Sequence, residues 1–407
     1  MPTKHKWKFK SYFRSGAYSW KGTAKASKRM KESVSEIKKV AKKDTSLSGE
    51  GAIELFVRLY PAVMHIDGSS GAIGSAINRT INVLMPMIIN ADWDMNTRGK
   101  WLEKLNVAIG DDGWGIFDEL RDHWGELCVF EGLAHLWADR LIPTVKDNWS
   151  SEQYCHFTGT DMCLSCLVYT GRYDELKNLL ALKENQSWFY MKFWALALEK
   201  QNKLQEALDY AELYNAQQKV NNQEETVNLF CESLLIKMGK IEEAYQKYGL
   251  ALSPYGTNLN IYRGLCKKYP SIDKKSILLD CIENKSVKGK WFASAKNAGY
   301  LDIAIECAMC DSADPGTLLR ASRDFADSDF SFALIVGVQG VAGLVSGEFY
   351  DPVTTSEVAY AFGQVEAIAL KNDKAEDFKM MLTKEMLKRS CKAKLKDVVL
   401  DRLKYLP

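Results

Sequence analysis

The sequence predicts an all-α protein, an array of paired antiparallel helices preceded by a basic N-terminal arm. Three observations lead to this fold class. The 407 residues contain only 9 prolines, and apolar residues recur at helical spacing nearly throughout the chain. Alternating apolar and polar runs bounded by Asn-Gly or Asp-Gly turns, which would indicate β-hairpins, are missing. Short turns of one type recur from about residue 155 onward and divide that part of the chain into helix pairs.

The first half of the chain shows separate amphipathic helices. Between residues 27 and 43 an apolar stripe recurs at helical intervals, and it comprises Met30, Val34, Ile37 and Ala41. Further helices are expected near residues 49–66, 70–89, 97–109, 115–127 and 130–146. Ser70 and Asn96 stand where N-capping side chains are expected for two of these helices.

Four short segments after about residue 155 share one pattern. They are "GRYDEL" from Gly171, "NKLQEA" from Asn202, "GKIEEA" from Gly239 and "GYLDIA" from Gly299. Each follows an apolar helix and opens a second one. The initial Gly or Asn supplies a left-handed residue that ends the first helix. The apolar residue two places later, and the Ala or Leu five places later, let the second helix pack closely on the first.

These turns resemble those of tetratricopeptide repeats over roughly residues 155–310. Their spacings of 31, 37 and 60 residues fit the family's period of about 34 if one degenerate repeat lies in the last interval. Ala244 with Tyr248 matches the family's Ala-x-x-x-aromatic position, whereas the other turns lack it and the family's Trp-x-x-Leu-Gly opening is absent. The resemblance implies a loose, tetratricopeptide-like α-solenoid, whose long surface would bind another protein.

Other stretches resemble a family of uncharacterised bacterial proteins. They are "SWKGTAKASKRMKESVSEIKKVAKKD", "DGSSGAIGSAIN", "KWLEKL" and "HWGELC". This resemblance implies a bacterial origin and an N-terminus that is an integral part of the protein. It implies no activity.

Charge is distributed unevenly along the chain. The net charge is +2, yet residues 1–43 carry +12 and residues 384–407 carry +5, so the middle carries −15. Ten cysteines without an apolar leader predict reduced thiols and a cytoplasmic protein. The uncharged run from Ser331 to Gly347 contains four glycines and is short for a bilayer span. We therefore expect a closely packed, buried helix there and no membrane contact.

The N-terminal arm poses the main functional question, because residues 4–31 contain no acidic residue and begin with alternating bases and aromatics. Three interpretations are open. Alternation would direct Trp7 and Phe9 toward the chain's own body and the lysines outward. The composition also resembles that of organellar targeting segments, although lysine exceeds arginine here. In the third interpretation the arm binds a polyanion, with lysines on phosphates and aromatics on exposed bases.

The polyanion interpretation assigns nucleic-acid binding to nine residues: Lys6, Trp7, Lys8, Lys10, Arg14, Lys21, Lys25, Lys28 and Arg29. Lysine acts as a point charge, so we expect little sequence preference. Inward rings and outward lysines are compatible, so the first and third interpretations can both hold. Because residues 1–26 precede the apolar stripe, we expect their deletion to abolish binding and to leave the helical fold intact.

Motifs for catalysis are missing: there is no Walker loop, no Gly-x-Gly-x-x-Gly, no His-Glu-x-x-His and no Gly-x-Ser-x-Gly. Two Cys-x-x-Cys pairs occur, and the candidate ligands around them are Cys155, His156, Cys163, Cys166, Cys307 and Cys310. Both pairs lie in apolar helical stretches, which favours core cysteines over a zinc site.

Two other segments suggest ligand binding more weakly. Asp92, Asp94, Asn96 and Glu103 have calcium-loop spacing, but Thr97 replaces the required glycine, and helix capping by Asn96 explains the same residues. The segment "GSSGAIGSAINRT" lacks the lysine of a phosphate-binding loop, and its small residues suit close helix packing. We expect no metal and no cofactor.

One constellation remains for an enzyme. Glu119, His123 and Glu126 share one face of a helix expected over residues 115–127. Two carboxylates and an imidazole could hold a divalent metal and activate water, although the same residues suit a solvated helix face. A metal-dependent hydrolase or nuclease is therefore the alternative function.

The favoured function is a non-enzymatic scaffold or adaptor that holds a protein partner, with nucleic acid or another polyanion at the arm. We expect four regions along the chain. They are a basic aromatic arm and amphipathic helix (1–44), a helical N-terminal domain (45–147), the repeat array (148–383) and a basic C-terminal helix (384–407).

Overall fold

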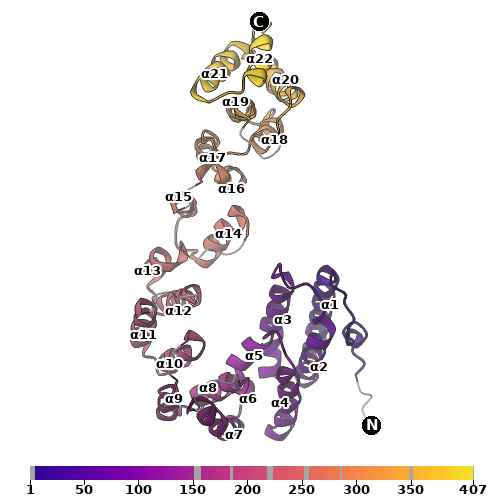
Figure 1. Ribbon diagram of the computed structural model, residues 1–407, viewed down its shortest axis with the longest axis vertical. Helices are drawn as coiled ribbons and strands as arrows, with labels where there is room; N and C mark the ends of the chain where they lie inside the picture. Colours follow the sequence, from indigo (N-terminus) through magenta and orange to yellow (C-terminus); the bar gives the residue numbers. More distant parts are fainter. Residues whose placement is uncertain are drawn as a thin grey trace. The chain divides into compact units, whose positions relative to one another are not determined.

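The protein is helical throughout the part described by the computed structural model. The described residues are 5–150, 157–183, 187–217, 223–251, 256–284, 287–347 and 352–406, and they contain no β-strand. The chain forms two compact units, Met1–Val227 and Asn228–Pro407. Figure 1 shows the order of the helices along the chain. Consecutive helices contact one another in pairs in both units. The prediction of an all-α fold is confirmed.

The first unit opens with a short 3-10 helix followed by four long α-helices. These are η1 (Lys8–Ser11), α1 (Thr23–Ala41), α2 (Thr45–Val63), α3 (Ala72–Ile89) and α4 (Met95–Gly110). Asp94 caps α4 by accepting the Thr97 N–H, so the prediction of an Asn96 cap is wrong. The N-cap of α3 is Gly71, at φ 66°, and not Ser70.

Helices α1 to α4 pack around a shared apolar interior. α1 contacts α2 and α3, and α2 contacts α3 and α4. Met30 and Ile37 of the predicted stripe are fully buried, which holds α1 on this core. Among the described helices, α3 alone is long and apolar enough to cross a membrane by length and composition, while part of its surface is buried among its neighbours.

A buried arginine joins the ends of two helices in this unit. The Arg98 guanidinium donates to the carbonyls of Ile88, Ile89 and Ala91 at the end of α3, and to that of Leu127, over 2.7–3.2 Å. Carbonyls at helix C-termini carry partial negative charge and lack intrahelical donors. The guanidinium therefore donates to several carbonyls that lack other hydrogen-bond donors. Burial lowers the pKa of Arg98.

The helix expected over residues 115–127 is interrupted. The structure has two short helices instead, α5 (Asp118–Asp122) and α6 (Trp124–Cys128), with His123 between them at φ −104° and ψ 19°. They precede α7 (Glu131–Ser150). The apolar residues Leu120, Trp124 and Leu127 are still buried, so the packing face survives the break.

Helix pairs follow in the remainder of the first unit. They are α8 (Gly159–Tyr169) with α9 (Tyr173–Leu180), and α10 (Trp188–Lys200) with α11 (Leu204–Gln217). α12 (Glu224–Lys237) contains the boundary between the two units.

The second unit continues with α13 (Ile241–Ala244) and a π-helical turn, η2 (Tyr245–Gly249). Two further pairs are α14 (Asn258–Lys268) with α15 (Lys274–Asn284), and, after the 3-10 turn η3 (Lys288–Trp291), α16 (Phe292–Ala298) with α17 (Leu301–Ala308). The α14–α15 pair lies where a degenerate repeat was expected, between the turns at Gly239 and Gly299.

The predicted left-handed turns are confirmed. Gly171, Gly239 and Gly299 have φ of 70°, 75° and 87°, and Asn202 has φ of 60°. In each turn the next residue donates its N–H to a carbonyl five positions earlier, as Arg172 does to Leu167 at 3.0 Å. This hydrogen bond satisfies a carbonyl at the end of the first helix and reverses the chain.

A fifth turn of the same type was not predicted. Asp373 has φ of 54°, and Lys374 donates its N–H to the Ala369 carbonyl at 2.9 Å. It joins α20 (Thr355–Lys371) to α21 (Ala375–Lys388). Helices paired through this turn geometry therefore extend beyond the region that resembles tetratricopeptide repeats.

The second unit ends in a cluster of five helices: α18 (Pro315–Phe325), α19 (Phe330–Ser346), α20, α21 and α22 (Ala393–Leu403). α19 is the uncharged run of the sequence, and it is buried as predicted. Added Cβ atoms would approach Val365 to 2.8 Å at Gly337, Leu319 to 2.8 Å at Gly340 and Pro315 to 2.8 Å at Gly343. Glycine thus permits the close packing around α19.

Candidate polyanion interface

The rings of the N-terminal arm are part of the core of the first unit. Trp7 is 5% exposed and Phe9 is fully buried, and the two rings stack with centroids 5.3 Å apart. Trp7 lies directly over Gly51 of α2, where an added Cβ would come within 2.4 Å of the indole. Phe13 and Tyr18 are also buried. The predicted inward orientation of Trp7 and Phe9 is confirmed.

Backbone hydrogen bonds fasten the arm along its length. The Lys8 N–H donates to Glu36 Oε1 at 2.9 Å, and the Gly16 N–H donates to the Pro61 carbonyl at 2.9 Å. Near the end of the arm, Trp20 accepts a hydrogen bond from Asp67. Since four buried aromatic rings would be lost with residues 1–26, the structure argues against the expectation that their deletion leaves the fold intact.

Two of the nine predicted binding residues already interact with the protein itself. Lys10 Nζ lies 2.9 Å from Glu54 Oε2. Arg29 pairs with Glu32 at 2.6 Å, and its guanidinium lies 4.0 Å from the centre of the Tyr12 ring. A third, Trp7, is buried, so its ring cannot stack on a base in this conformation.

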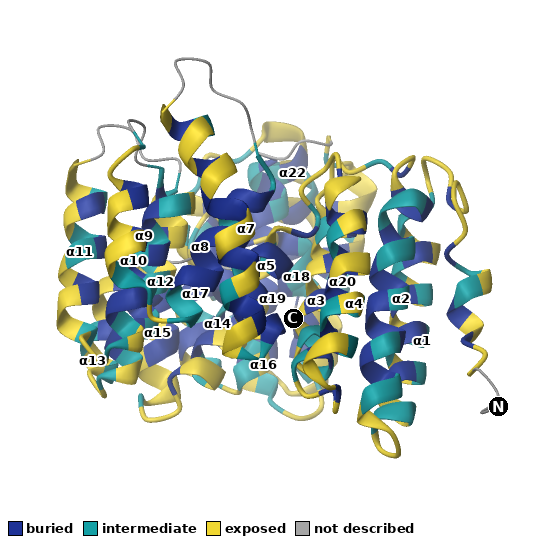
Figure 2. Cartoon of the chain, turned by 90° about the horizontal axis from the view of Figure 1, so that it is seen from below, coloured by how far each residue is buried: buried dark blue, intermediate teal, exposed yellow. Residues whose placement is uncertain are grey.

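The other six predicted residues are exposed cations: Lys6, Lys8, Arg14, Lys21, Lys25 and Lys28. Within the described residues, no carboxylate lies at ion-pair distance from any of them. Buried and exposed residues alternate here, so Lys6 and Lys8 face away from the buried rings of Trp7 and Phe9. Figure 2 shows this alternation along the segment beside α1. The arm is thus attached by its rings and presents its charges to solvent.

Helix α1 extends this cationic surface. It and the residues following it add five further exposed lysines: Lys31, Lys38, Lys39, Lys42 and Lys43. The buried residues of α1 are Ala26, Met30, Ser33 and Ile37, and at helical spacing the lysines of α1 fall on the opposite side. We call the six exposed cations of the predicted set and these five lysines the cationic surface.

Trp20 is an exposed aromatic residue that the prediction did not include. Its side chain is 65% exposed and lies next to Lys21 at the end of the arm. The sequence offered one signal, because Trp20 falls outside the alternating segment that directs Trp7 and Phe9 inward. An exposed indole beside lysines is suited to stacking on an unpaired base.

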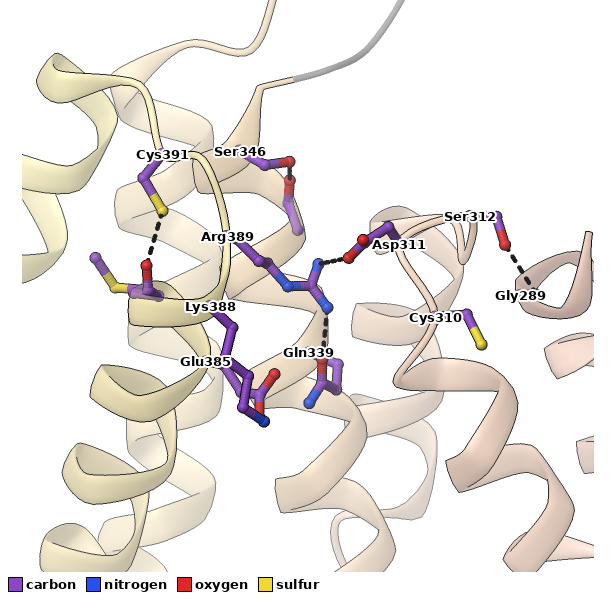
Figure 3. Close-up of polar contacts among 12 residues, drawn as sticks. Gly289, Cys310, Asp311, Ser312, Gln339, Ser346, Glu385, Lys388, Arg389 and Cys391 are labelled. Atoms are coloured by element: carbon purple, nitrogen blue, oxygen red, sulfur yellow. Dashed lines mark hydrogen bonds and ion pairs between the residues drawn. The ribbon is translucent and has the colours of Figure 1, made fainter.

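The basic C-terminal segment differs, because most of its cations interact with the second unit. Arg389 donates to Gln339 Oε1 at 2.7 Å and lies 3.9 Å from Asp311, and Lys388 pairs with Glu385 at 2.6 Å (Figure 3). Lys392 donates to the Gly347 carbonyl beyond the end of α19. These side chains are occupied by intramolecular contacts.

The candidate hydrolase residues Glu119, His123 and Glu126 do come together. His123 Nδ1 lies 2.6 Å from Glu126 Oε2, and Nε2 lies 3.7 Å from Glu119 Oε1. Hydrogen bonding to Glu119 and Glu126 raises the pKa of His123 to about 10. A protonated imidazole has no lone pair for a metal ion. The geometry is that of an ion-paired cluster, and the hydrolase function remains a prediction.

The other candidate metal ligands have structural contacts. Asp94 accepts both the Thr97 N–H and its hydroxyl, and Glu103 pairs with Arg140. Cys163 and Cys166 are fully buried in α8, where burial raises the pKa of Cys163 to about 12. Cys155 and His156 lie outside the described residues. Across the described ranges, no three His, Cys, Asp or Glu side chains are grouped to hold a metal ion.

Comparison with known proteins identifies no relative. No protein family, curated protein or solved structure matches this chain. The class of protein is therefore defined by the fold alone: an all-helical protein of adjacent helix pairs, with a cationic surface on its first unit.

Proposed function

We propose that this protein is a non-enzymatic helical scaffold that binds a polyanion, foremost nucleic acid, through the cationic surface. One observation carries the proposal. The arm is held by four buried rings, while four cations of the arm and seven lysines on or just after α1 are exposed without carboxylate partners in the described residues. A folded surface that carries many unpaired cations is suited to the phosphates of a nucleic acid, because binding releases the counterions of the nucleic acid.

The chemistry of these side chains favours contact with the backbone over base recognition. Ten of the eleven cations are lysines, which act as point charges and do not offer the planar, paired donors that read base edges. Trp20 adds one stacking surface, which only an unpaired base can use. We expect binding with little sequence preference and a contribution from Trp20 on single strands.

The helix pairs support the scaffold part of the proposal. Pairs joined by left-handed turns occur at Gly171, Asn202, Gly239, Gly299 and Asp373. An α-solenoid built from such pairs would present a long surface to a protein partner. In this proposal the protein connects a partner held on the helix pairs with a polyanion at the arm.

A salt titration with fluorescently labelled duplex and single-stranded oligonucleotides tests the polyanion function. If the six exposed cations of the predicted set contact phosphates, log affinity should fall with log salt with a slope of roughly −5 on duplex DNA, and less steeply on single strands. The triple variant Lys21→Glu/Lys25→Glu/Lys28→Glu should bind more weakly and reduce the slope by about 3.

The C-terminal segment provides the matched control. Lys384, Lys394 and Lys396 have no ion-pair partner among the described residues, and their replacement by glutamate changes the net charge equally. Equal weakening by both triple variants would mean that net charge, and not the cationic surface, controls binding. Absence of binding by the unmodified protein at low salt would refute the proposal. Trp20→Ala should weaken single-strand binding and leave duplex binding unchanged.

A further inference from the structure

A small groove lies between α1 and α3, on the edge of the cationic surface. Its volume is about 200 Å³. Each helix contributes four residues with the same spacing of i, i+3, i+4 and i+7. They are Ser27, Met30, Lys31 and Val34 from α1, and Ala76, Arg79, Thr80 and Val83 from α3. Two neighbouring helices thus present matching faces to one shallow channel.

The floor of this groove is apolar. Met30 and Ala76 are buried beneath it, and Val34 and Val83 are half-buried along its sides. Thr80 is also buried, but its hydroxyl donates to the Ala76 carbonyl at 2.8 Å. Its hydrogen-bonding capacity is therefore largely used inside α3, and the groove offers mainly methyl and methylene surface.

The rim of the groove is positively charged. Lys31 and Arg79 are exposed, and no carboxylate lies at ion-pair distance from either within the described residues. Arg79 is the only charged residue of α3. No acidic residue lines the groove. An occupant must therefore combine an apolar ridge with flanking negative charge.

We propose that this groove binds an amphipathic helix of a protein partner, with an apolar ridge on the floor and acidic side chains beside Lys31 and Arg79. Helices dock in this way through anchors at i, i+3, i+4 and i+7. The groove is smaller than the roughly 300–1,000 Å³ of small-molecule sites, which suits a short row of side chains. The apolar floor offers phosphates neither charge nor hydrogen-bond donors, and the concave form of the groove does not suit a flat membrane surface.

This site goes beyond the polyanion function and does not depend on it, because the two use different residues except for Lys31. Binding can be measured by fluorescence anisotropy with a labelled 16-residue helical peptide, carrying leucines at i, i+3, i+4 and i+7 and glutamates beside them. A scrambled peptide of the same composition is the control for charge alone. We expect the ordered peptide to bind at least about tenfold more tightly than the scrambled one.

Two substitutions test the groove directly. Ala76→Leu fills the floor, and Arg79→Glu reverses the rim charge at an exposed position where folding should be unaffected. Each should weaken binding of the ordered peptide at least about tenfold. Lys394→Glu, which changes the net charge equally at the other end of the chain, should have no effect. Melting curves of all three variants verify that they fold.

Several results would overturn the assignment. These are equal affinity for the ordered and scrambled peptides, equal weakening by Lys394→Glu and Arg79→Glu, and unchanged binding by Ala76→Leu. Failure of the unmodified protein to bind the ordered peptide would also overturn it. If phosphatidylglycerol vesicles or an oligonucleotide bind in its place and lose affinity with Arg79→Glu, the groove belongs to a lipid or nucleic-acid surface.

Discussion

The two ends of the chain are both strongly basic, yet their cations are used differently. In residues 1–43, eleven of the thirteen described Lys and Arg side chains are exposed without a carboxylate partner in the described residues. In residues 384–407, five of the eight interact with the second unit: Lys388, Arg389, Lys392, Arg402 and Lys404. Similar composition therefore gives an accessible surface at one end and internal contacts at the other.

The difference arises from what surrounds each segment. The C-terminal cations lie near the end of α19 and the polar groups of neighbouring helices, where Lys392 meets a carbonyl and Arg389 meets the buried Gln339. The N-terminal cations lie on the side of the arm and of α1 that faces away from the core. A charge count thus shows how many cations are present, whereas their availability depends on the fold.

The largest expected effect concerns the rings that hold the arm. Trp7→Ala removes a buried indole and should lower the free energy of unfolding by about 3 kcal/mol or more. Trp20→Ala, at an exposed position, should change it by less than about 0.5 kcal/mol. Chemical denaturation followed by circular dichroism measures both. Equal effects would mean that the arm is not part of the core.

A somewhat smaller loss is expected at the C-terminal end. Arg389→Ala leaves the buried Gln339 without its 2.7 Å donor and should cost about 1–3 kcal/mol. Lys384→Ala, on the exposed side of α21, is the matched control and should leave the denaturation midpoint unchanged. If Arg389→Ala also left the denaturation midpoint unchanged, the two basic ends would not differ in the way described.

Within the arm, one paired lysine can be compared with an unpaired one. Lys10 lies 2.9 Å from the largely buried Glu54, so Lys10→Ala should destabilise the first unit by about 0.5–1 kcal/mol. Lys6→Ala should leave stability unchanged, because this side chain has no such partner in the described residues. Thermal melting at low ionic strength compares the two variants. Identical melting temperatures would contradict the contact between Lys10 and Glu54.

The smallest effect is expected for a C-terminal ion pair that is largely exposed to solvent. Lys404 and Asp401 are 2.8 Å apart, and both are largely exposed to solvent. Water and salt screen such pairs, so Lys404→Ala should produce no measurable change in melting temperature. A clear drop would show that exposed pairs also stabilise this end of the chain.

Backbone geometry was predictable where glycine or asparagine was present. The turns at Gly171, Asn202, Gly239 and Gly299 were recognised because these residues tolerate positive φ. Asp373 adopts the same conformation, but aspartate is far more common at helix starts and in exposed turns, so it gave no distinct signal. The interruption at His123 was also missed, since the apolar spacing of Leu120, Trp124 and Leu127 continues across it.

The candidate interface was predictable only in part. The alternation of lysines and aromatic residues predicted that Trp7 and Phe9 point inward and that Lys6 and Lys8 point outward. The partner of Lys10 could not be predicted, because Glu54 lies on another helix and only the fold brings the two together. The exposure of Trp20 and the groove between α1 and α3 likewise depend on tertiary packing, which local periodicity does not describe.

The contact between Trp7 and Gly51 allows the attachment of the arm to be altered from outside the arm. A Cβ at position 51 would come within 2.4 Å of the indole, while alanine itself favours a helix more than glycine does. Gly51→Ala should thus retain α2 and displace the ring, which would separate the arm from its binding place without removing any of its residues. One added methyl group in α2 can therefore detach the arm and its cations from the core while the arm stays joined to the chain. Binding of a polyanion would then have a larger entropic cost, because the arm would have to become ordered.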